Sequence, residues 1–167
     1  MIYEAESGDI TIAATGDSII MRSLSVYQEE RFKALMDLIR QADVGFTNLE
    51  TLIHEFEVSP EAIAGGTFMA SHPRHLKELE WAGFNMVSCA NNHAYDYGQG
   101  GVLATLKNLE KAGLAHSGTG LNLAEARGPG YLETAKGRVA LISAVSTFND
   151  VARATEYAAE DADITLM

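Results

Sequence analysis

The side chains best suited to chemistry in this chain lie in one stretch, Cys-Ala-Asn-Asn-His-Ala-Tyr-Asp-Tyr-Gly, which runs from Cys89 to Gly98. It follows the apolar residues 84–89, which are typical of a short buried strand, and leads into a segment with a helical apolar repeat. Two amides, an imidazole and a carboxylate therefore gather at the carboxyl end of a strand. Ligands of open α/β sheets bind at such ends, so this stretch is the first candidate site.

Each polar side chain of this stretch suggests a role. Asn92 offers a neutral amide oxygen to a cation, and His93 offers a nitrogen that binds metal or carries a proton near neutral pH. Asp96 can fold back onto the imidazole, fix its tautomer and leave the second nitrogen for a substrate, which is how a general acid is held. The alternative is a polar loop whose side chains bond to turn backbone, with the histidine only solvated.

Two earlier strand ends carry a carboxylate each. Asp17 follows the alternating residues 10–15 and would present a hard oxygen ligand from a rigid support, although a Gly-Asp pair is also a common turn. Glu50 follows a short strand expected at 44–48. Right-handed crossovers between parallel strands would bring the ends after Asp17, Glu50 and Asn92 to one rim of the sheet.

The elements that must position these residues alternate between strand and helix patterns, which predicts an α/β fold of two or three layers. The expected strands are short apolar runs near 10–15, 44–48, 84–89 and 114–117, followed by a hairpin at 131–134 and 139–145. The expected helices lie at 29–42, from 73 onward, at 98–112, at 123–127 and at 155–163. In the first helix, Phe32, Leu35, Met36 and Ile39 predict one packed face.

Three features near the candidate residues have a structural alternative. Asn48 points the same way as Glu50 along its strand, but we expect it to cap the turn. The glycine-rich helix entry at 98–101 could receive a phosphate or carboxylate on its free amide groups, or serve close packing. Cys89, the single cysteine, is expected to be a buried and inert thiol.

Four short motifs resemble those of a known family in their order and spacing: Thr15-Gly16-Asp17, Asn48-Leu49-Glu50-Thr51, Ala90-Asn91-Asn92-His93 with Asp96-Tyr97-Gly98, and Gly118-Thr119-Gly120. The third resembles the Asn-His box of the calcineurin-like metallophosphoesterases. Over residues 10–145 the chain is more similar still to the CapA family of capsule synthesis, or poly-gamma-glutamate biosynthesis, proteins. The resemblance implies a metallophosphoesterase-like α/β sandwich with a mixed sheet, of which residues 1–167 would be a single domain incomplete at its C-terminus.

The resemblance also implies a catalytic site. Asp17, Glu50 and Asn92 would bind a divalent metal ion, Mn, Mg, Fe or Zn, with Glu50 at the position of a carboxylate that often bridges two metals. The metal would polarise a phosphoryl or acyl oxygen and lower the pKa of bound water. His93, oriented by Asp96, would protonate the leaving oxygen.

The chain departs from the family pattern in two places. Phosphoesterases commonly place a histidine two residues after the aspartate, where this chain has Ile19. Related sequences also continue with further histidines of the metal site and with the strands of a second sheet. The chain would then be a fragment, a reduced member, or one completed by another copy or chain.

The length and composition of the chain exclude several classes of protein. A chain of 167 residues with 47% hydrophobic and 21% charged residues is typical of one globular domain. Its formal charge of -11 would repel a nucleic-acid backbone. Residues 1–9 show no secretion signal and no run reaches the length of a membrane span, so the sequence as written predicts a cytoplasmic protein, whereas CapA-like proteins are often membrane-anchored and surface-facing.

These observations leave three hypotheses. The first is a metal-dependent hydrolase of phosphoesterase type, or one acting on an amide or glutamyl polymer, in poly-gamma-glutamate or capsule biosynthesis. The second is a non-catalytic accessory protein of capsule assembly that binds an anionic polymer or a partner. The third is a structural domain whose polar loops only form turns. A homo-oligomer, or a chain supplying the missing half, is expected because a half-length member would expose sheet edges and apolar surface.

Overall fold

The main sheet has four parallel strands in the order β1-β2-β5-β6. The computed structural model describes residues 8–62 and 66–145. The four strands are β1 (Ile12–Ser18), β2 (Val44–Leu49), β5 (Met86–Ser88) and β6 (Ala115–Ser117). Each coincides with one of the four apolar runs of the sequence, so the predicted α/β fold is confirmed.

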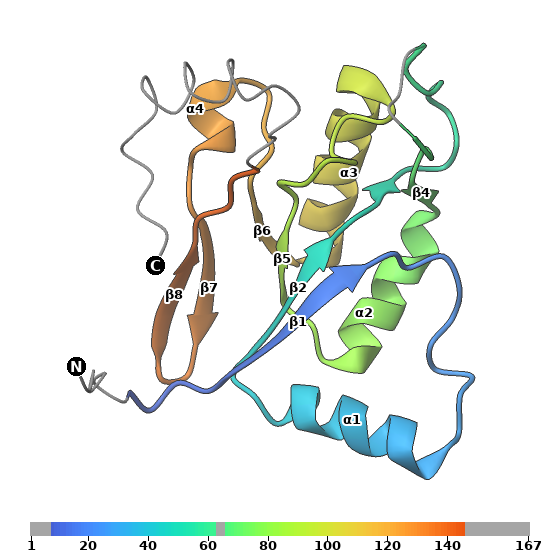
Figure 1. The fold of residues 1–167 in the computed structure, drawn as a ribbon. Helices are drawn as coiled ribbons and strands as arrows, with labels where there is room; N and C mark the ends of the chain where they lie inside the picture. Colours follow the sequence, from blue (N-terminus) through green and yellow to red (C-terminus); the bar gives the residue numbers. More distant parts are fainter. Residues whose placement is uncertain (1–7, 63–65, 146–167) are drawn as a thin grey trace, which may run out of the picture.

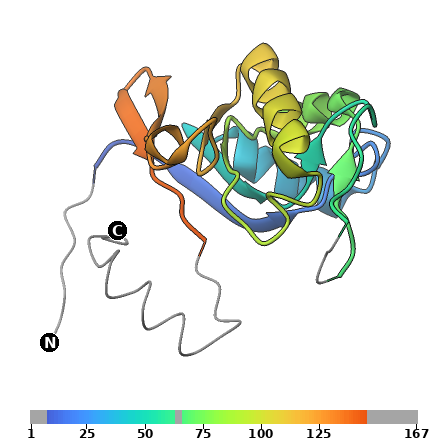
Figure 2. The same ribbon diagram turned by 90° about the horizontal axis from the view of Figure 1, so that it is seen from above.

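Three helices cover one face of this sheet. They are α1 (Glu30–Arg40), α2 (Leu76–Ala82) and α3 (Gly98–Ala112). The described residues also form the turn η1 (Pro73–His75) and the short α4 (Leu123–Ala126). Because the strands follow one another in spatial order, right-handed crossovers place these helices on the same side. Both ribbon views show this two-layer arrangement, with β1 at the front of the sheet (Figures 1 and 2). In the described part of the chain, no helix is long and apolar enough to cross a membrane.

The hydrophobic core lies between the helices and the sheet. Val87 of β5, Leu79 of α2 and Leu109 of α3 are essentially inaccessible to solvent. The first helix contributes Met36 and Ile39, as its stripe predicts, but Leu35 is 52% exposed. Its prediction as a packing residue was wrong because α1 buries only a narrow stripe, and Leu35, one position from Met36, turns about 100° away from it.

Two small sheets flank the main one. β3 (Leu52–Ile53) pairs in parallel with β4 (Ala70–Ser71), and the hairpin β7 (Gly130–Thr134) and β8 (Gly137–Leu141) is antiparallel. The antiparallel strands expected for a mixed sheet are therefore present, but they form a sheet of their own. The second hairpin strand ends four residues earlier than the sequence suggested. The helix expected at 155–163 lies outside the described residues.

Candidate functional site at the carboxyl rim of the sheet

The carboxyl ends of three strands bring the predicted residues together. Asp17 lies near the end of β1 and pairs in register with Asn48 of β2, which in turn pairs with Ser88 of β5. Glu50 follows β2 directly, and the Asn-Asn-His stretch follows β5. The register of β1 shifts between Ala14 and Asp17. The parallel topology thus gathers residues from positions 17 to 96 at one rim.

The two carboxyl groups of Asp17 and Glu50 form a hydrogen-bonded pair. Burial raises the pKa of Glu50, and the neighbouring Asp17 carboxylate raises it further, by the hydrogen bond between them and by charge repulsion. The pKa of Asp17 is lowered, because the side-chain amide of Asn48 donates a hydrogen bond to its carboxylate at 2.9 Å and Glu50 donates another. The contact between the two groups therefore favours a proton on Glu50 over one on Asp17.

His93 and Asp96 form the pair that the sequence predicts. The Nδ1 atom of His93 lies 2.8 Å from Oδ2 of Asp96, and the backbone amide of Met69 donates to the same oxygen at 2.6 Å. The Nε2 atom of His93 lies 3.8 Å from Oε1 of Glu50. The side chains of His93, Asp96 and Glu50 are only 14%, 9% and 15% exposed. Asp96 therefore orients the imidazole and turns its second nitrogen toward the carboxyl pair.

Asn91 is a positioning residue that the sequence reasoning did not single out. Its amide nitrogen donates to Oδ1 of Asn48 at 3.2 Å and to the carbonyl of Leu49 at 2.9 Å, and its oxygen accepts from the backbone amide of His93 at 3.0 Å. Asn48, which we expected only to cap a turn, links this amide to Asp17. Asn91 therefore ties the end of β2 to the loop after β5.

Asn92, the predicted amide ligand, is exposed beside its buried neighbour Asn91. Adjacent residues of this turn point in different directions, so only one of the two amides can brace the strands. The adjacent Asn-Asn pair was the available signal, but both residues have the same chemistry and the sequence alone could not separate them. The role of Asn92 as a metal ligand stays a prediction.

The glycine-rich entry of α3 is closely packed. A Cβ atom at Gly98 would collide with the carboxylate of Glu61, and one at Gly100 would press on Val58. Gly98 also has a φ of +56°, which favours glycine. The segment around 58–61 therefore lies on the first turn of α3, and the close-packing alternative accounts for these glycines.

The donor set at the rim matches a hard divalent cation in its chemistry. Asp17 and Glu50 carry two carboxyl groups in direct contact, and a cation between them would relieve the repulsion that raises the pKa of Glu50. Asn92 could add a neutral oxygen. Within residues 8–62 and 66–145, however, no three His, Cys, Asp or Glu side chains gather in a geometry that could hold a metal ion.

The fold and this rim define an α/β protein with a carboxylate, amide and imidazole site at the ends of parallel strands. The family profile described as "Bacterial capsule synthesis protein PGA_cap" matches residues 7–165. The chain therefore belongs to the PGA_cap family, whose domain is metallophosphoesterase-like.

Individual relatives agree with this assignment. Two proteins of Sinorhizobium fredii (strain NBRC 101917 / NGR234), described as "Uncharacterized protein y4sH" and "Uncharacterized protein y4uA", are each 39% identical over 153 residues, which cover 90% of this chain and 33% of theirs. The "Capsule biosynthesis protein CapA" of Bacillus anthracis is 33% identical over 81 residues, 48% of this chain and 20% of that protein. The chain thus spans about a third, or less, of the length of these relatives.

Proposed function

We propose that this chain carries the catalytic rim of a metal-dependent hydrolase of phosphoesterase type that acts in capsule or poly-gamma-glutamate synthesis. The observation that supports it best is the convergence of the Asp17–Glu50 pair with the His93–Asp96 pair. One pair supplies charge for a cation and the other supplies an oriented proton carrier.

The residues divide the chemistry as follows. Asp17, Glu50 and Asn92 would hold the divalent ion, which when bound would polarise the scissile phosphoryl or acyl oxygen. His93 would carry a proton on Nε2 toward the leaving oxygen, since Nδ1 is held by Asp96 at 2.8 Å. The partial burial of His93 and Glu50 limits the water that competes for that proton.

Elemental analysis after incubation with Mn²⁺ or Zn²⁺ tests the metal part of this proposal. Wild type is expected to retain about one or two equivalents, and the Asp17→Ala, Glu50→Ala double variant to lose them. Glu110→Gln, an exposed carboxylate at the other end of α3, is the control and should retain the metal. Equal metal content in all three proteins, or none in any, would contradict the proposed site.

His93→Ala tests the catalytic part. This variant should keep the metal but lose phosphoester turnover by about 10²–10⁴-fold, the range expected for a general acid. Full turnover in His93→Ala would exclude the proposed proton donor.

A second function is favoured by one specific feature of the rim. Ile19 stands, 44% exposed, where a nitrogen ligand is common in phosphoesterases. This feature supports the accessory alternative, in which the rim binds an anionic polymer without turnover. Because the chain carries a formal charge of -11, poly-gamma-glutamate should then bind only when a divalent cation bridges the two. In that case His93→Ala would keep the polymer, and EDTA would release it.

A further inference from the structure

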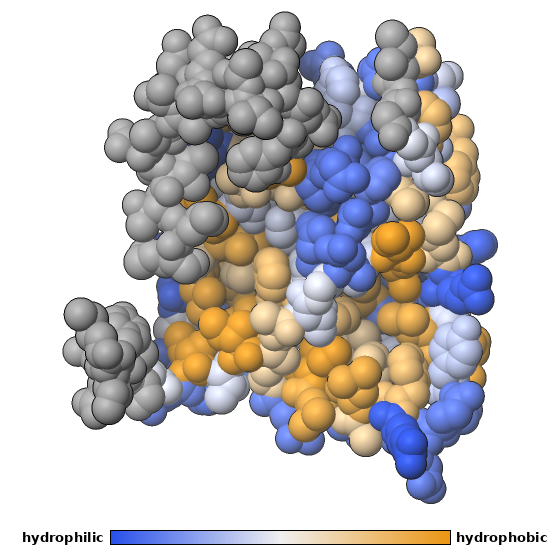
Figure 3. All heavy atoms as spheres, in the orientation of Figure 1, coloured by the Kyte–Doolittle hydropathy of each residue, from blue (hydrophilic) through white to orange (hydrophobic). Residues whose placement is uncertain are grey.

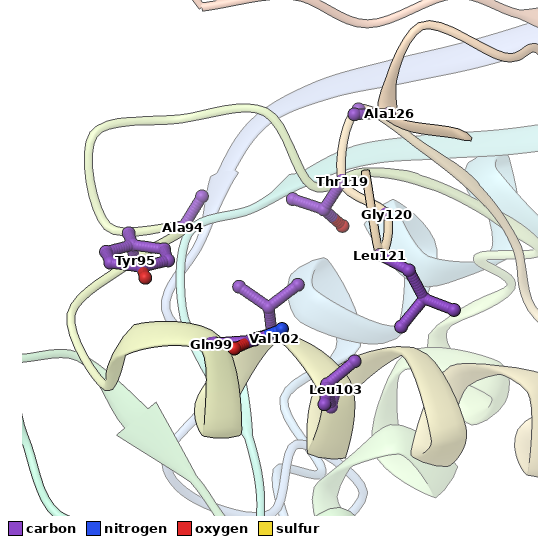
Figure 4. A pocket seen from close by; sticks show the side chains of 10 residues that line it. Ala94, Tyr95, Gln99, Val102, Leu103, Thr119, Gly120, Leu121 and Ala126 are labelled. Carbon is purple, nitrogen blue, oxygen red and sulfur yellow. The ribbon is translucent and has the colours of Figure 1, made fainter. Parts of the chain in front are cut away.

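A pocket lies beside the loop that carries His93 and Asp96. Between these two residues in sequence, Ala94 and Tyr95 line a cavity of about 350 Å³ that lies between α3 and the segment after β6 (Figure 4). Neither His93 nor Asp96 is part of its wall. One short loop therefore contributes the oriented imidazole to the rim and an aromatic ring to the pocket.

Two segments far apart in the sequence form the facing walls. The first turns of α3 contribute Gln99, Val102 and Leu103, and the segment after β6 contributes Thr119 and Leu121 (Figure 4). This second wall is held closely against its surroundings. Gly118 has a φ of +103° and a Cβ there would collide with Ala90, while a Cβ at Gly120 would collide with Glu125. The pocket is therefore set by backbone packing as well as by side chains.

The lining combines aliphatic surface with a few polar groups. Val102, Leu103 and Leu121 offer apolar area, and the hydroxyl groups of Tyr95 and Thr119 and the amide of Gln99 can form hydrogen bonds; none of the described lining residues is charged. A phosphate or carboxylate would find no counter-charge among these residues. A sugar ring has hydroxyl groups on most sides and would need more polar partners. A flat ring with apolar faces and polar edges matches the lining best.

We propose that this pocket binds an uncharged heteroaromatic group of about the size of a nucleobase. The assignment of this pocket as the subsite for the uncharged part of a substrate rests on the function proposed above. The binding of the ring in the pocket does not depend on that function. A ligand that spans the loop would have its ring in the pocket and its anionic end on the divalent cation that Asp17 and Glu50 would hold. Specificity would then come from the pocket and chemistry from the rim.

Titration with adenosine, an uncharged heteroaromatic compound without phosphate, tests the pocket directly. In amide NMR spectra of the whole chain, adenosine should shift the signals of residues 118–121 and 102–103, with a Kd of the order of millimolar. Leu121→Arg should weaken this binding at least about tenfold by filling the pocket with a charged side chain. Leu123→Arg is the matched control, because Leu123 is 63% exposed against 62% for Leu121 but does not line the pocket.

The possible outcomes separate this inference from the function of the rim. Suppose that the wild-type chain hydrolyses no phosphoester but that adenosine still binds to the Asp17→Ala, Glu50→Ala variant. This result would support the pocket and contradict only the function proposed for the rim. Three results would overturn the inference whatever the rim does: no shifts in the pocket with adenosine, equal shifts with ribose, or equal losses in Leu121→Arg and Leu123→Arg.

Discussion

Asn91 and Asn92 are neighbours of the same type with opposite surroundings. Asn91 is buried and makes three hydrogen bonds, two with residues at the end of β2 and one with the backbone of His93, whereas Asn92 is exposed. A buried amide that loses its partners costs more than an exposed one, because the groups left behind remain unsatisfied. The two positions should therefore respond differently to the same substitution.

Asn91→Ala is expected to lower the free energy of unfolding by about 1–3 kcal/mol, because it leaves the Leu49 carbonyl and the Asn48 amide oxygen without their donor. Asn92→Ala, the matched control, should change it by less than about 0.5 kcal/mol. Urea unfolding followed by circular dichroism measures both. If Asn92 is a metal ligand, Asn92→Ala should weaken Mn²⁺ binding more than Asn91→Ala does. Equal losses of stability in the two variants would contradict the bracing role of Asn91.

Two buried histidines make stability depend on pH. Burial lowers the pKa of His54, although the negative charge of Glu57 raises it in part. Burial also lowers the pKa of His75, and the nearby charges of Arg74 and His72 lower it further, while Glu78 opposes them. The pKa values of both histidines in the folded state lie below the unfolded value of about 6.5. At a pH between the folded and the unfolded pKa values, the unfolded chain therefore binds more protons than the folded chain. Stability should be complete above about pH 7 and fall as the pH drops through 6.5.

The urea midpoint at pH 7.5 and at pH 5.5 measures this dependence. Each histidine contributes a slope of up to about 1.4 kcal/mol per pH unit in this window. His54→Phe should reduce the slope, since the ring lies against Tyr97 and Phe56 and its Nε2 atom has no hydrogen-bond partner in the structure. A slope that is unchanged in His54→Phe would show that His54 does not titrate in this window.

At the scale of elements, close contacts between backbones decide how the helices meet the sheet. A Cβ atom at Gly45 in β2 would overlap the carbonyl of Gly83, and one at Gly83 would overlap the backbone of Arg40 at the end of α1. Gly83 also has a φ of +102° at the C-cap of α2. The ends of α1 and α2 can therefore approach β2 only because these positions lack side chains.

Gly45→Ala should destabilise the fold by about 1–3 kcal/mol, the cost of overpacking against a backbone that cannot move aside. Gly16→Ala in β1 is the control, because a Cβ atom at Gly16 would meet no atom within 4 Å. It should be neutral or stabilising by up to about 1 kcal/mol, since alanine has less freedom in the unfolded chain. Thermal unfolding of the two variants measures the difference, and equal midpoints would contradict the contact.

The sequence predicted the strands of the main sheet and the periodic helices well, and the pairing of the two-residue strands poorly. The four main strands and α1 were visible because apolar runs and helical stripes reflect burial directly. The pairing of β3 with β4 was not, because each has two residues and depends on a partner 18 positions away. At the site, Asp17, Glu50 and the His93–Asp96 pair followed from strand ends. The bracing role of Asn91 depends on turn geometry, which residue types do not encode.

At the scale of the whole molecule, no helix within residues 8–62 and 66–145 covers the second face of the parallel sheet. The three helices of the core lie on the other side, and in β1 Ile12 is 59% exposed and Ala14 is also exposed. Apolar residues are visible on this side of the molecule (Figure 3). Among the described strands, β1 is also an edge of the sheet. Parallel sheets are normally covered on both faces, so this surface favours association.

We predict that the purified chain associates with itself through this face and the β1 edge. Ile12→Lys should shift the equilibrium toward monomer, by about tenfold or more in dissociation constant, because burying a lysine without a partner opposes the contact. Leu38→Lys, on α1 and 65% exposed, is the matched control and should leave the equilibrium unchanged. Sedimentation equilibrium over a range of protein concentrations measures the dissociation constants. A wild-type chain that is monomeric throughout, or equal shifts in the two variants, would show that this face is not the contact. A shift in Ile12→Lys alone would identify the sheet face around Ile12 as the surface through which two copies meet.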